Sequence, residues 1–252
     1  MRLVRFRFGD RIATGALDGD EVRLLRGTFF EAPIPTGQSV PAADVRLLAP
    51  VLPSKVVAVG KNYAEHAAEM GGEVPEEPLL FLKPSTAVIG PGDPIAYPSI
   101  SKRMDYEGEL ACVIGQVVRR MASEEAGKAI LGYTCANDVT LRDLQGSDGQ
   151  WTRAKGFDTS CPLGPWVETE LDPADVALET RVNGEVRQSA RTAQLAFDPA
   201  ELVAFISSFM TLLPGDVVLT GTPAGVGPLE VGDEVQVSIE GIGTLANTVV
   251  AA

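Results

Sequence analysis

The 252-residue sequence predicts an α+β fold in which strands dominate. Its 26 glycines and 18 prolines are typical of a chain with many turns, and therefore with many strands. Two turn signals, Asp18-Gly19-Asp20 and Asn183-Gly184, predict β-hairpins. The clearest helix signals lie in two segments, residues 62–71 and 198–210. Hydrophobic residues make up 45% of the chain, which is enough for a sizeable core.

The first 50 residues predict a small β domain. Strands are expected at residues 3–8 and 21–25, on either side of a hairpin turn. Arginine and phenylalanine alternate in the first strand, and this pattern predicts an edge strand rather than a signal peptide. A proline-rich passage leads to residues 48–53, which have the composition of a linker. We therefore place the second domain at residues 55–252.

The second domain is expected to begin with a buried strand at residues 55–60. Asn62 and Gly71 then have the positions of an N-cap and a C-terminal stop for a short helix. Asp198-Pro199-Ala200-Glu201 is a stronger helix start, because it combines a cap, a first-turn proline and a glutamate at the third position. The helix behind it predicts one apolar stripe facing the core, made of Leu202, Phe205, Ile206, Phe209 and Met210.

The charge of the chain limits its partners. The formal net charge is -13 and the isoelectric point is about 4.6. Such a chain repels nucleic acid and anionic membrane surfaces, so neither is expected as a partner. A small acidic substrate would need local cations to bind.

The sequence also predicts the compartment. No stretch is long and apolar enough to span a membrane, so we expect a cytoplasmic protein. The three cysteines, Cys112, Cys135 and Cys161, are odd in number, lie in apolar stretches and form no C-x-x-C pair. They are expected to be free, buried thiols in a reducing environment.

Three acidic residues have a spacing that could hold a divalent cation. Glu107 and Glu109 lie in the run 105–115, which reads as one strand. Residues two apart on a strand face the same side, about 7 Å apart along the chain. Asp138, after the next apolar run, could complete the site. Carboxylates without thiol or imidazole favour Mg²⁺ or Mn²⁺, although the spacing alone also fits a solvated strand face.

His66 is the only histidine in the chain. A single histidine can be purely structural, but here Glu69 follows at i+3 on the predicted short helix, where the two side chains can meet. A carboxylate beside an imidazole fixes its tautomer and raises its basicity, as a general base requires. Glycines follow at once, so this helix could be a mobile lid.

Asp138, Arg142 and Gln145 have the spacing of one helical face. One interpretation is an exposed helix on which Asp138 and Arg142 form a routine ion pair. The other is a ligand-binding row in which the arginine binds a substrate carboxylate and the amide adds a hydrogen bond. Lys155, beside glycine and phenylalanine, is expected to be half-buried and could neutralise an oxyanion, or could be a surface lysine with a buried stem.

The segment 219–228, Leu-Thr-Gly-Thr-Pro-Ala-Gly-Val-Gly-Pro, is a glycine-rich loop after a strand. It lacks the spacing of a nucleotide-binding loop. It could be a plain turn, or it could present backbone N–H groups and a hydroxyl to a ligand.

Six motifs in order resemble the fumarylacetoacetate hydrolase family, over roughly residues 55 to 250. They are Gly60-Lys-Asn-Tyr-Ala-Glu-His66, Phe81-Leu-Lys-Pro-Ser85, Tyr106-Glu-Gly-Glu-Leu110, Asn137-Asp-Val-Thr-Leu-Arg142, Lys155-Gly-Phe-Asp158 and Thr220-Gly-Thr-Pro-Ala-Gly-Val-Gly227. The resemblance implies a mixed β-roll that is usually dimeric, so a homodimer is expected. The N-terminal 50 residues look like the small domain appended in one branch of the family.

The resemblance also implies roles for the candidate residues. The metal ligands would be Glu107, Glu109 and Asp138, with Mg²⁺ or Mn²⁺ typical and Ca²⁺ possible. His66 and Glu69 match a water-activating dyad on a lid. The positions that hold the substrate are Arg142, Gln145, Lys155 and Thr222. The chain departs from the larger members in having no aspartate between Lys55 and His66, so the cation should keep open positions for water and substrate.

The implied substrate is a small 2-oxo or 2,4-dioxo acid. The expected reaction is hydrolysis of a C–C bond in an acylpyruvate or fumarylpyruvate through an enolate, with Lys155 as a catalytic cation and His66 as the base. The same site could instead isomerise 2-hydroxydienedioates or decarboxylate oxaloacetate. A metal-stabilised binding module without activity would not need His66, Glu69 and Lys155, and a structural β-scaffold would need none of the site residues.

Overall fold

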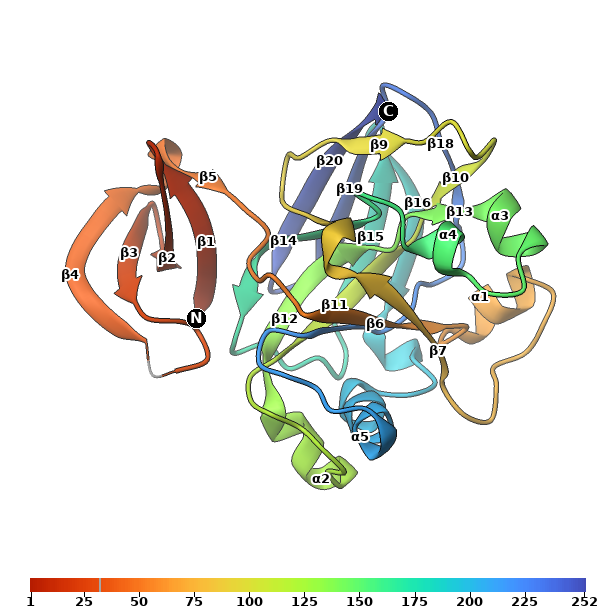
Figure 1. Ribbon diagram of the computed structural model, residues 1–252, viewed down its shortest axis with the longest axis horizontal. Coiled ribbons are helices and arrows are strands. Elements are labelled where there is room, and N and C mark those ends of the chain that lie inside the picture. The colour runs from red at the N-terminus through yellow and green to blue at the C-terminus, as the bar shows by residue number, and fades with distance from the viewer. Residues whose placement is uncertain (32) are drawn as a thin grey trace.

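Strands dominate the computed structural model, which describes residues 1–31 and 33–252 (Figure 1). The helices are short except for the last. They are α1 (Ala64–Glu69), α2 (Ser123–Ala126), α3 (Arg142–Ser147), α4 (Thr152–Lys155) and α5 (Pro199–Phe209), with single 3-10 turns at Ala42–Asp44, Ser85–Ala87, Gly127–Ala129 and Thr192–Gln194. No helix within the described ranges has the length and apolar character needed to cross a bilayer.

The strands form three sheets. In spatial order, the largest contains β4 (Ile34–Pro41), β3 (Glu21–Arg26), β2 (Arg11–Asp18), β1 (Arg2–Phe8), β14 (Cys161–Glu168), β12 (Ile130–Asn137), β11 (Gly108–Ile114), β17 (Val217–Leu219), β6 (Lys55–Gly60) and β7 (Leu79–Pro84), with β5 (Arg46–Leu47) beside β1 and β8 (Val88–Ile89) beside β14. The second contains β16 (Glu185–Arg191), β15 (Ala177–Val182), β19 (Glu234–Ile239), β20 (Gly243–Ala251) and β9 (Ile95–Tyr97). The third contains β13 (Thr140–Leu141), β10 (Met104–Tyr106) and β18 (Gly227–Leu229). Both predicted hairpin turns are confirmed, between β2 and β3 and between β15 and β16.

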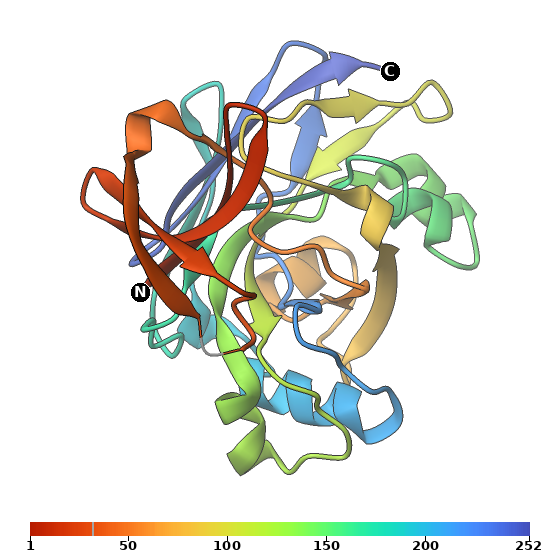
Figure 2. The ribbon, with the colours of Figure 1, turned by 60° about the vertical axis from the view of Figure 1, so that its left-hand side comes forward.

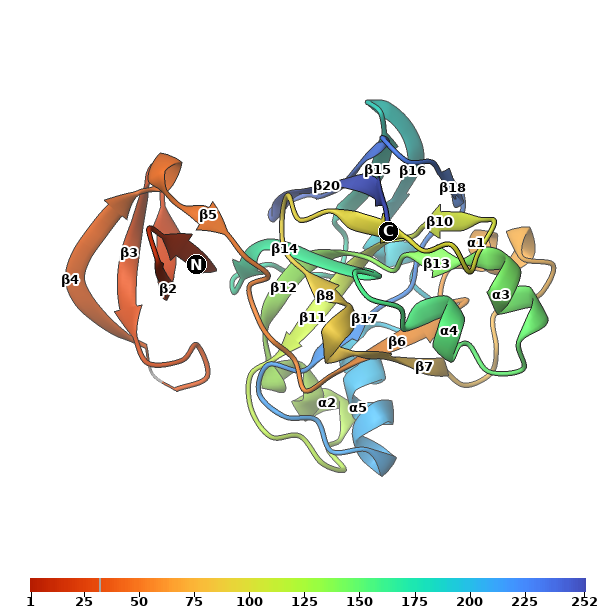
Figure 3. The same cartoon turned by 45° about the horizontal axis from the view of Figure 1, so that its top comes forward.

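The first five strands form a lobe beside the rest of the molecule (Figures 1 and 3). Val4, Phe6 and Val22 are buried at its centre. The prediction that the first strand is an edge strand is wrong. β1 pairs with β2 along its whole length, and its other side pairs with β14 at Arg2 and Leu3 and with β5 farther along. The alternating pattern indicates which face of β1 is buried. It does not indicate which strands pair with β1.

The main core lies between the large sheet and the five-stranded sheet, and α5 closes one end of it. Figure 2 shows α2 and α5 side by side next to the strands. Leu110, Cys112 and Ile114 of β11 pack in the same cluster as residues of α5 and β19. The three cysteines are free and buried, as predicted, and burial raises the pKa of each thiol.

The capped start of α5 is confirmed, but part of its predicted stripe is wrong. The Asp198 carboxylate accepts a hydrogen bond from the Glu201 N–H at 2.9 Å, and the Glu201 side chain accepts one from the Asp198 N–H at 2.8 Å. Leu202 and Ile206 are buried, whereas Phe209 is 62% exposed. Phe209 is the last helical residue, where the helix has already passed the edge of the core.

Asp216 joins β6 to β17, the parallel pair next to β11. Its buried carboxylate accepts hydrogen bonds from the Ser54 N–H at 3.1 Å, the Ser54 hydroxyl at 2.6 Å and the Leu213 N–H at 2.8 Å, and it pairs with the Lys55 ammonium. Burial alone would raise the pKa of Asp216, but the bonds from Lys55, Ser54 and Leu213 outweigh burial and lower it. The charged form therefore stabilises the fold.

Asp216→Asn should lower the free energy of unfolding by about 2–4 kcal/mol, because the amide cannot accept from all these donors. The folded-state pKa is lowered, so the stabilisation is complete above the ordinary carboxyl pKa of about 4 and is lost as the pH falls through the lower folded value. Urea unfolding at several pH values measures both effects. Asp10→Asn, at an exposed position, is the matched control. Equal stability of the Asp216 variant and the wild type at neutral pH would contradict this account.

Candidate functional site

The chain crosses from one sheet to another at the candidate metal ligands. The sequence predicted a single strand over residues 105–115, and this is wrong. β10 ends at Tyr106 in the three-stranded sheet, and β11 begins at Gly108 in the largest sheet. Glu107 lies at the break, where its N–H donates to the Asn137 side-chain oxygen at 3.0 Å. The strand pairing of two different sheets produces this break, and a local apolar pattern does not encode it.

The break still brings the three predicted carboxylates together. Glu107, Glu109 and Asp138 are all buried, and one oxygen from each lies within 4.8 Å of the other two. Asp138 lies just after β12, the strand that pairs with β11. Three buried oxygen ligands in this arrangement fit a hard divalent cation such as Mg²⁺, Mn²⁺ or Ca²⁺.

Buried cations surround two of the three carboxylates. The Lys155 ammonium donates to Glu107 and to Asp138, each at 2.7 Å. Arg142 donates to Glu107 at 2.5 Å and to Asp105 at 2.9 Å. Burial alone would raise the pKa of Glu107, but Lys155 and Arg142 outweigh it and lower the pKa to about 2. Lys155 was expected to be half-buried, but it is fully buried, with its ammonium 4.8 Å from the centre of the Phe81 ring.

Lys83 is a buried site residue to which the sequence analysis gave no role. Its ammonium donates to Asp138 at 2.6 Å, and the side chain is inaccessible to solvent. The spacing in the motif around Lys83 could have indicated this role. Lys83 follows Phe81 by two residues on β7, so both side chains lie on the same face of the sheet.

Glu109 differs from the other two carboxylates. It accepts a hydrogen bond from the Gly221 N–H at 2.6 Å, and within the described residues no lysine or arginine forms an ion pair with it. Burial, together with the charges of Asp138 and Glu107, raises the pKa of Glu109 well above its ordinary value. Added positive charge at this point would relieve the repulsion, which supports a cation site here.

Arg142 and Gln145 lie together, but Asp138 does not share a helix with them. α3 begins at Arg142, and the two residues of β13 separate it from Asp138. The Arg142 guanidinium donates to the Gln145 side-chain oxygen at 2.6 Å, and its carboxylate partners are Asp105 and Glu107. The prediction that the three residues share one helical face is therefore wrong, and so is the interpretation that Asp138 and Arg142 form a routine ion pair.

The predicted pair of His66 and Glu69 is present on α1. The His66 Nδ1 and a Glu69 oxygen are 3.1 Å apart, and the imidazole is buried. Glu69 also accepts from the Gly225 N–H at 3.1 Å, which ties α1 to the glycine-rich loop. If Nδ1 carries the proton toward Glu69, Nε2 is left as a hydrogen-bond acceptor.

Asn62 does not cap α1, contrary to the sequence prediction. The residue before the helix is Tyr63, and no side chain caps it. The buried Asn62 amide instead donates to the carbonyls of Phe197 and Thr220, at 2.9 and 2.8 Å, and accepts from the Phe197 N–H at 2.8 Å. Asn62 thus joins the start of the α1 segment to two distant loops.

The Thr222 hydroxyl uses most of its hydrogen-bonding capacity on other residues of the chain. It donates to the Gly108 carbonyl at 2.9 Å and accepts from the Gln188 amide at 2.8 Å. A hydroxyl has one proton and two lone pairs, so a ligand could contact Thr222 only through its remaining lone pair.

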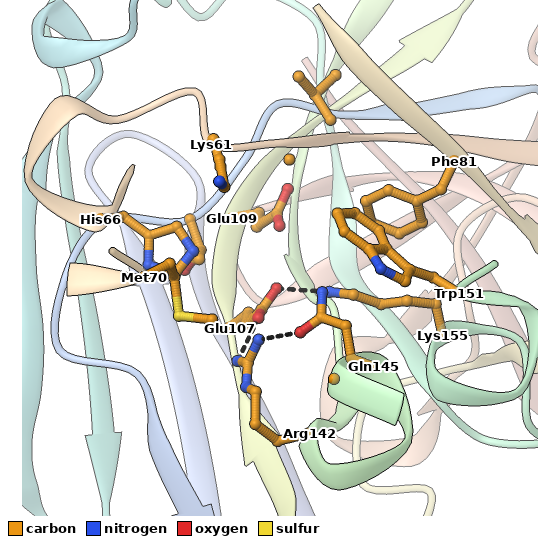
Figure 4. A pocket seen from close by; sticks show the side chains of 14 residues that line it. Lys61, His66, Met70, Phe81, Glu107, Glu109, Arg142, Gln145, Trp151 and Lys155 are labelled. Atoms are coloured by element: carbon orange, nitrogen blue, oxygen red, sulfur yellow. Dashed lines mark hydrogen bonds and ion pairs between the residues drawn. The ribbon is translucent and has the colours of Figure 1, made fainter. Parts of the chain in front are cut away.

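Several of these side chains line one cavity with a volume of about 390 Å³ (Figure 4). Its polar end contains Glu107, Glu109, Arg142, Gln145 and Lys155, and His66 lies at one side. Val59, Met70, Phe81 and Trp151 add apolar lining, and Figure 4 shows Met70 beside His66 and the two aromatic rings on the side of Lys155. The rings of Phe81 and Trp151 meet edge to face, with their centres 5.4 Å apart. A small acid with a charged head could bind its head at the polar end.

Comparison with known proteins gives two family matches. Residues 55–250 match the family described as Fumarylacetoacetate (FAA) hydrolase C-terminal, and residues 1–50 match the one described as Rv2993c-like, N-terminal. Protein Rv2993c of Mycobacterium tuberculosis is 54% identical over 260 residues, which cover 99% of this chain and 98% of that protein. The mitochondrial oxaloacetate tautomerase FAHD2A of Bos taurus is 46% identical over 224 residues, which cover 84% of this chain and 71% of that protein.

Solved structures share the fold over the whole chain. The 5-carboxymethyl-2-hydroxymuconate delta-isomerase from Mycobacterium smegmatis has a TM-score of 0.95 and 54% identity, with 100% of both chains covered. The maleylpyruvate hydrolase from Sphingobium sp. SYK-6, solved with manganese(II) and pyruvate, has a TM-score of 0.83 and 31% identity, again with 100% of both chains covered. The strand-dominated fold predicted from the sequence is confirmed by these similarities.

Proposed function

Because the chain belongs to the fumarylacetoacetate hydrolase family, we propose that it is a divalent-cation-dependent enzyme acting on small 2-oxo or 2,4-dioxo acids. The observation that carries this proposal is the shared cavity. His66, whose Nδ1 contacts Glu69, lines the same 390 Å³ cavity as Glu107 and Glu109 of the carboxylate cluster and the cations Arg142 and Lys155. Neither a binding module nor a scaffold needs both the histidine and the cluster.

The ligands of the cation would be Glu107, Glu109 and Asp138. The cation would supply Lewis-acid polarisation of the 2-oxo group, which lowers the barrier to forming an enolate. Arg142 and Lys155 contribute positive charge beside the cluster and can offset the charge of the substrate carboxylate. His66, held by Glu69 through Nδ1, can take a proton at Nε2.

For an acylpyruvate, the reaction is hydrolysis of the bond between C3 and C4. His66 takes a proton from a water molecule, whose oxygen attacks the C4 carbonyl. The C3–C4 bond then breaks, its electron pair remains with the pyruvate fragment as an enolate, and a proton returned to C3 gives pyruvate. The other product is the carboxylic acid of the acyl tail. The dyad supports this assignment because water activation requires a base that is held in position.

A second candidate uses the same residues without water. His66 could remove a proton from C3 and return it at oxygen or at another carbon, which is tautomerisation or double-bond migration. The names of the more similar proteins favour this candidate. The relatives named as isomerase and oxaloacetate tautomerase are 54% and 46% identical, whereas the maleylpyruvate hydrolase is 31% identical.

A substrate panel tests the proposal and separates the two reactions. Acetylpyruvate, fumarylpyruvate, oxaloacetate and a 2-hydroxydienedioate are each incubated with Mg²⁺ or Mn²⁺, and again with a chelator. Release of pyruvate from the first two marks hydrolysis, and faster keto–enol conversion or isomerisation of the last two marks proton transfer. All activity should disappear with the chelator. Absence of any cation-dependent conversion across the panel would contradict the proposed function.

A further inference from the structure

The cavity contains a third cation besides Arg142 and Lys155. Lys61 lines it next to Gly60 and Val59, at the end of β6. Figure 4 shows Lys61 and Arg142 on opposite sides of the two glutamates, with the Lys61 ammonium directed toward the cavity. Because lysine is a cation, the property that Lys61 adds to the cavity is its positive charge.

The backbone is held in an unusual conformation at Lys61. Its φ is +58°, in the left-handed region that non-glycine residues rarely adopt. The next residue, Asn62, fixes this turn through three hydrogen bonds to the Phe197 and Thr220 segments. Residues that the surrounding fold holds in such a conformation cluster at active sites and ligand clamps.

The ammonium also lies close to Gly72. A Cβ placed on Gly72 would lie 2.8 Å from the Lys61 Nζ, so the side chain extends toward the backbone at this glycine. Gly72 lies just after α1, which carries His66. The Lys61 ammonium is therefore seated between the end of β6 and the segment that holds the dyad.

Lys61 is distinguished by its lack of a partner. Lys155 is bonded to two carboxylates and Arg142 to two. Lys61 forms no ion pair within 4.0 Å and no hydrogen bond through its side chain with any residue that the structure describes. The net charge of the chain is -13, yet Lys61 is a partly buried cation that points into the cavity and has no carboxylate partner. Such a cation can bind an anionic group of a ligand.

The geometry points to Lys61 as the residue that selects dicarboxylate substrates by binding their distal carboxylate. This inference rests on the proposed function, which places the 2-oxo acid head at the carboxylate cluster. The carboxylate next to the 2-oxo group then binds at the polar end of the cavity, and the second carboxylate of the substrate lies toward Lys61. The preferred substrates are thus 2-oxo acids with a charged tail, such as oxaloacetate or fumarylpyruvate, rather than acids with a neutral acyl tail.

The test replaces Lys61 by methionine, which has similar length and no charge, and by arginine, which keeps the charge. Lysine and methionine are equally strained at φ +58°, so Lys61→Met should fold normally, and thermal unfolding checks this. KM for oxaloacetate should rise roughly tenfold or more in Lys61→Met, and Lys61→Arg should recover most of the loss. Pyruvate, which has no tail, should inhibit the wild type and both variants with equal constants.

The outcomes separate the two proposals. An unchanged KM for oxaloacetate in Lys61→Met, or an equal loss of pyruvate inhibition, would overturn the role of Lys61. A wild-type protein that converts acetylpyruvate but neither dicarboxylate would also overturn it, while leaving the proposed function intact. A wild type that converts no 2-oxo acid with Mg²⁺ or Mn²⁺ would instead contradict the proposed function.

Discussion

His66→Ala should reduce turnover by about two to four orders of magnitude and leave divalent cation binding unchanged. The imidazole is the only histidine in the chain, and it is held by Glu69 at the edge of the cavity, so no other imidazole can replace it. Removal of a positioned general base costs about two to four orders of magnitude in rate. The measurements are kcat on the best substrate of the panel and Mn²⁺ titration calorimetry on the metal-free protein.

Two further variants sharpen this test. Glu65→Ala changes an exposed carboxylate on the same helix, and it should retain wild-type activity. Glu69→Gln keeps the shape of the partner but removes its charge, so it should lose activity to an intermediate extent. Full turnover by His66→Ala would refute the assigned role, and weakened Mn²⁺ binding would show that the imidazole serves the cation site instead.

Glu109→Gln should weaken divalent cation binding by about a hundredfold or more, because it removes one of three anionic oxygen ligands. The substitution keeps the volume of the side chain and its acceptor for the Gly221 N–H. It also removes a buried negative charge that lies among like charges. The metal-free variant should therefore be at least as stable as the metal-free wild type.

Calorimetry with Mn²⁺ and thermal unfolding with and without the ion measure both effects. Ions should raise the unfolding temperature of the wild type and have little effect on the variant. Glu76→Gln, at an exposed position near α1, is the matched control and should bind the ion like the wild type. An unchanged affinity in Glu109→Gln would remove Glu109 from the ligand set.

Local patterns predicted the parts of the site that depend on short spacings. His66 and Glu69 are one helical turn apart, and that geometry holds wherever the helix lies. Glu107 and Glu109 still converge, although the strand assumed for them is broken. The cap at Asp198 and the hairpin at residues 183–184 are equally local, and both are present.

The features that the sequence did not predict depend on long-range pairing. Lys83 reaches Asp138 only because β7 lies at the far side of β6 in the assembled sheet. Asp105 becomes a partner of Arg142 because β10 pairs with β13. The interior position of β1 likewise depends on β14, more than 150 residues away along the chain. No window of neighbouring residues contains this information.

The loop at residues 219–228 gives one backbone N–H to Glu109, from Gly221, and another to Glu69, from Gly225. Two N–H groups, four residues apart in one loop, therefore hold one carboxylate of the candidate metal cluster and the carboxylate that contacts His66. A shift of this short segment would move both supports at once. The geometry of the carboxylate cluster and that of the His66–Glu69 pair are thus coupled through one short stretch of backbone.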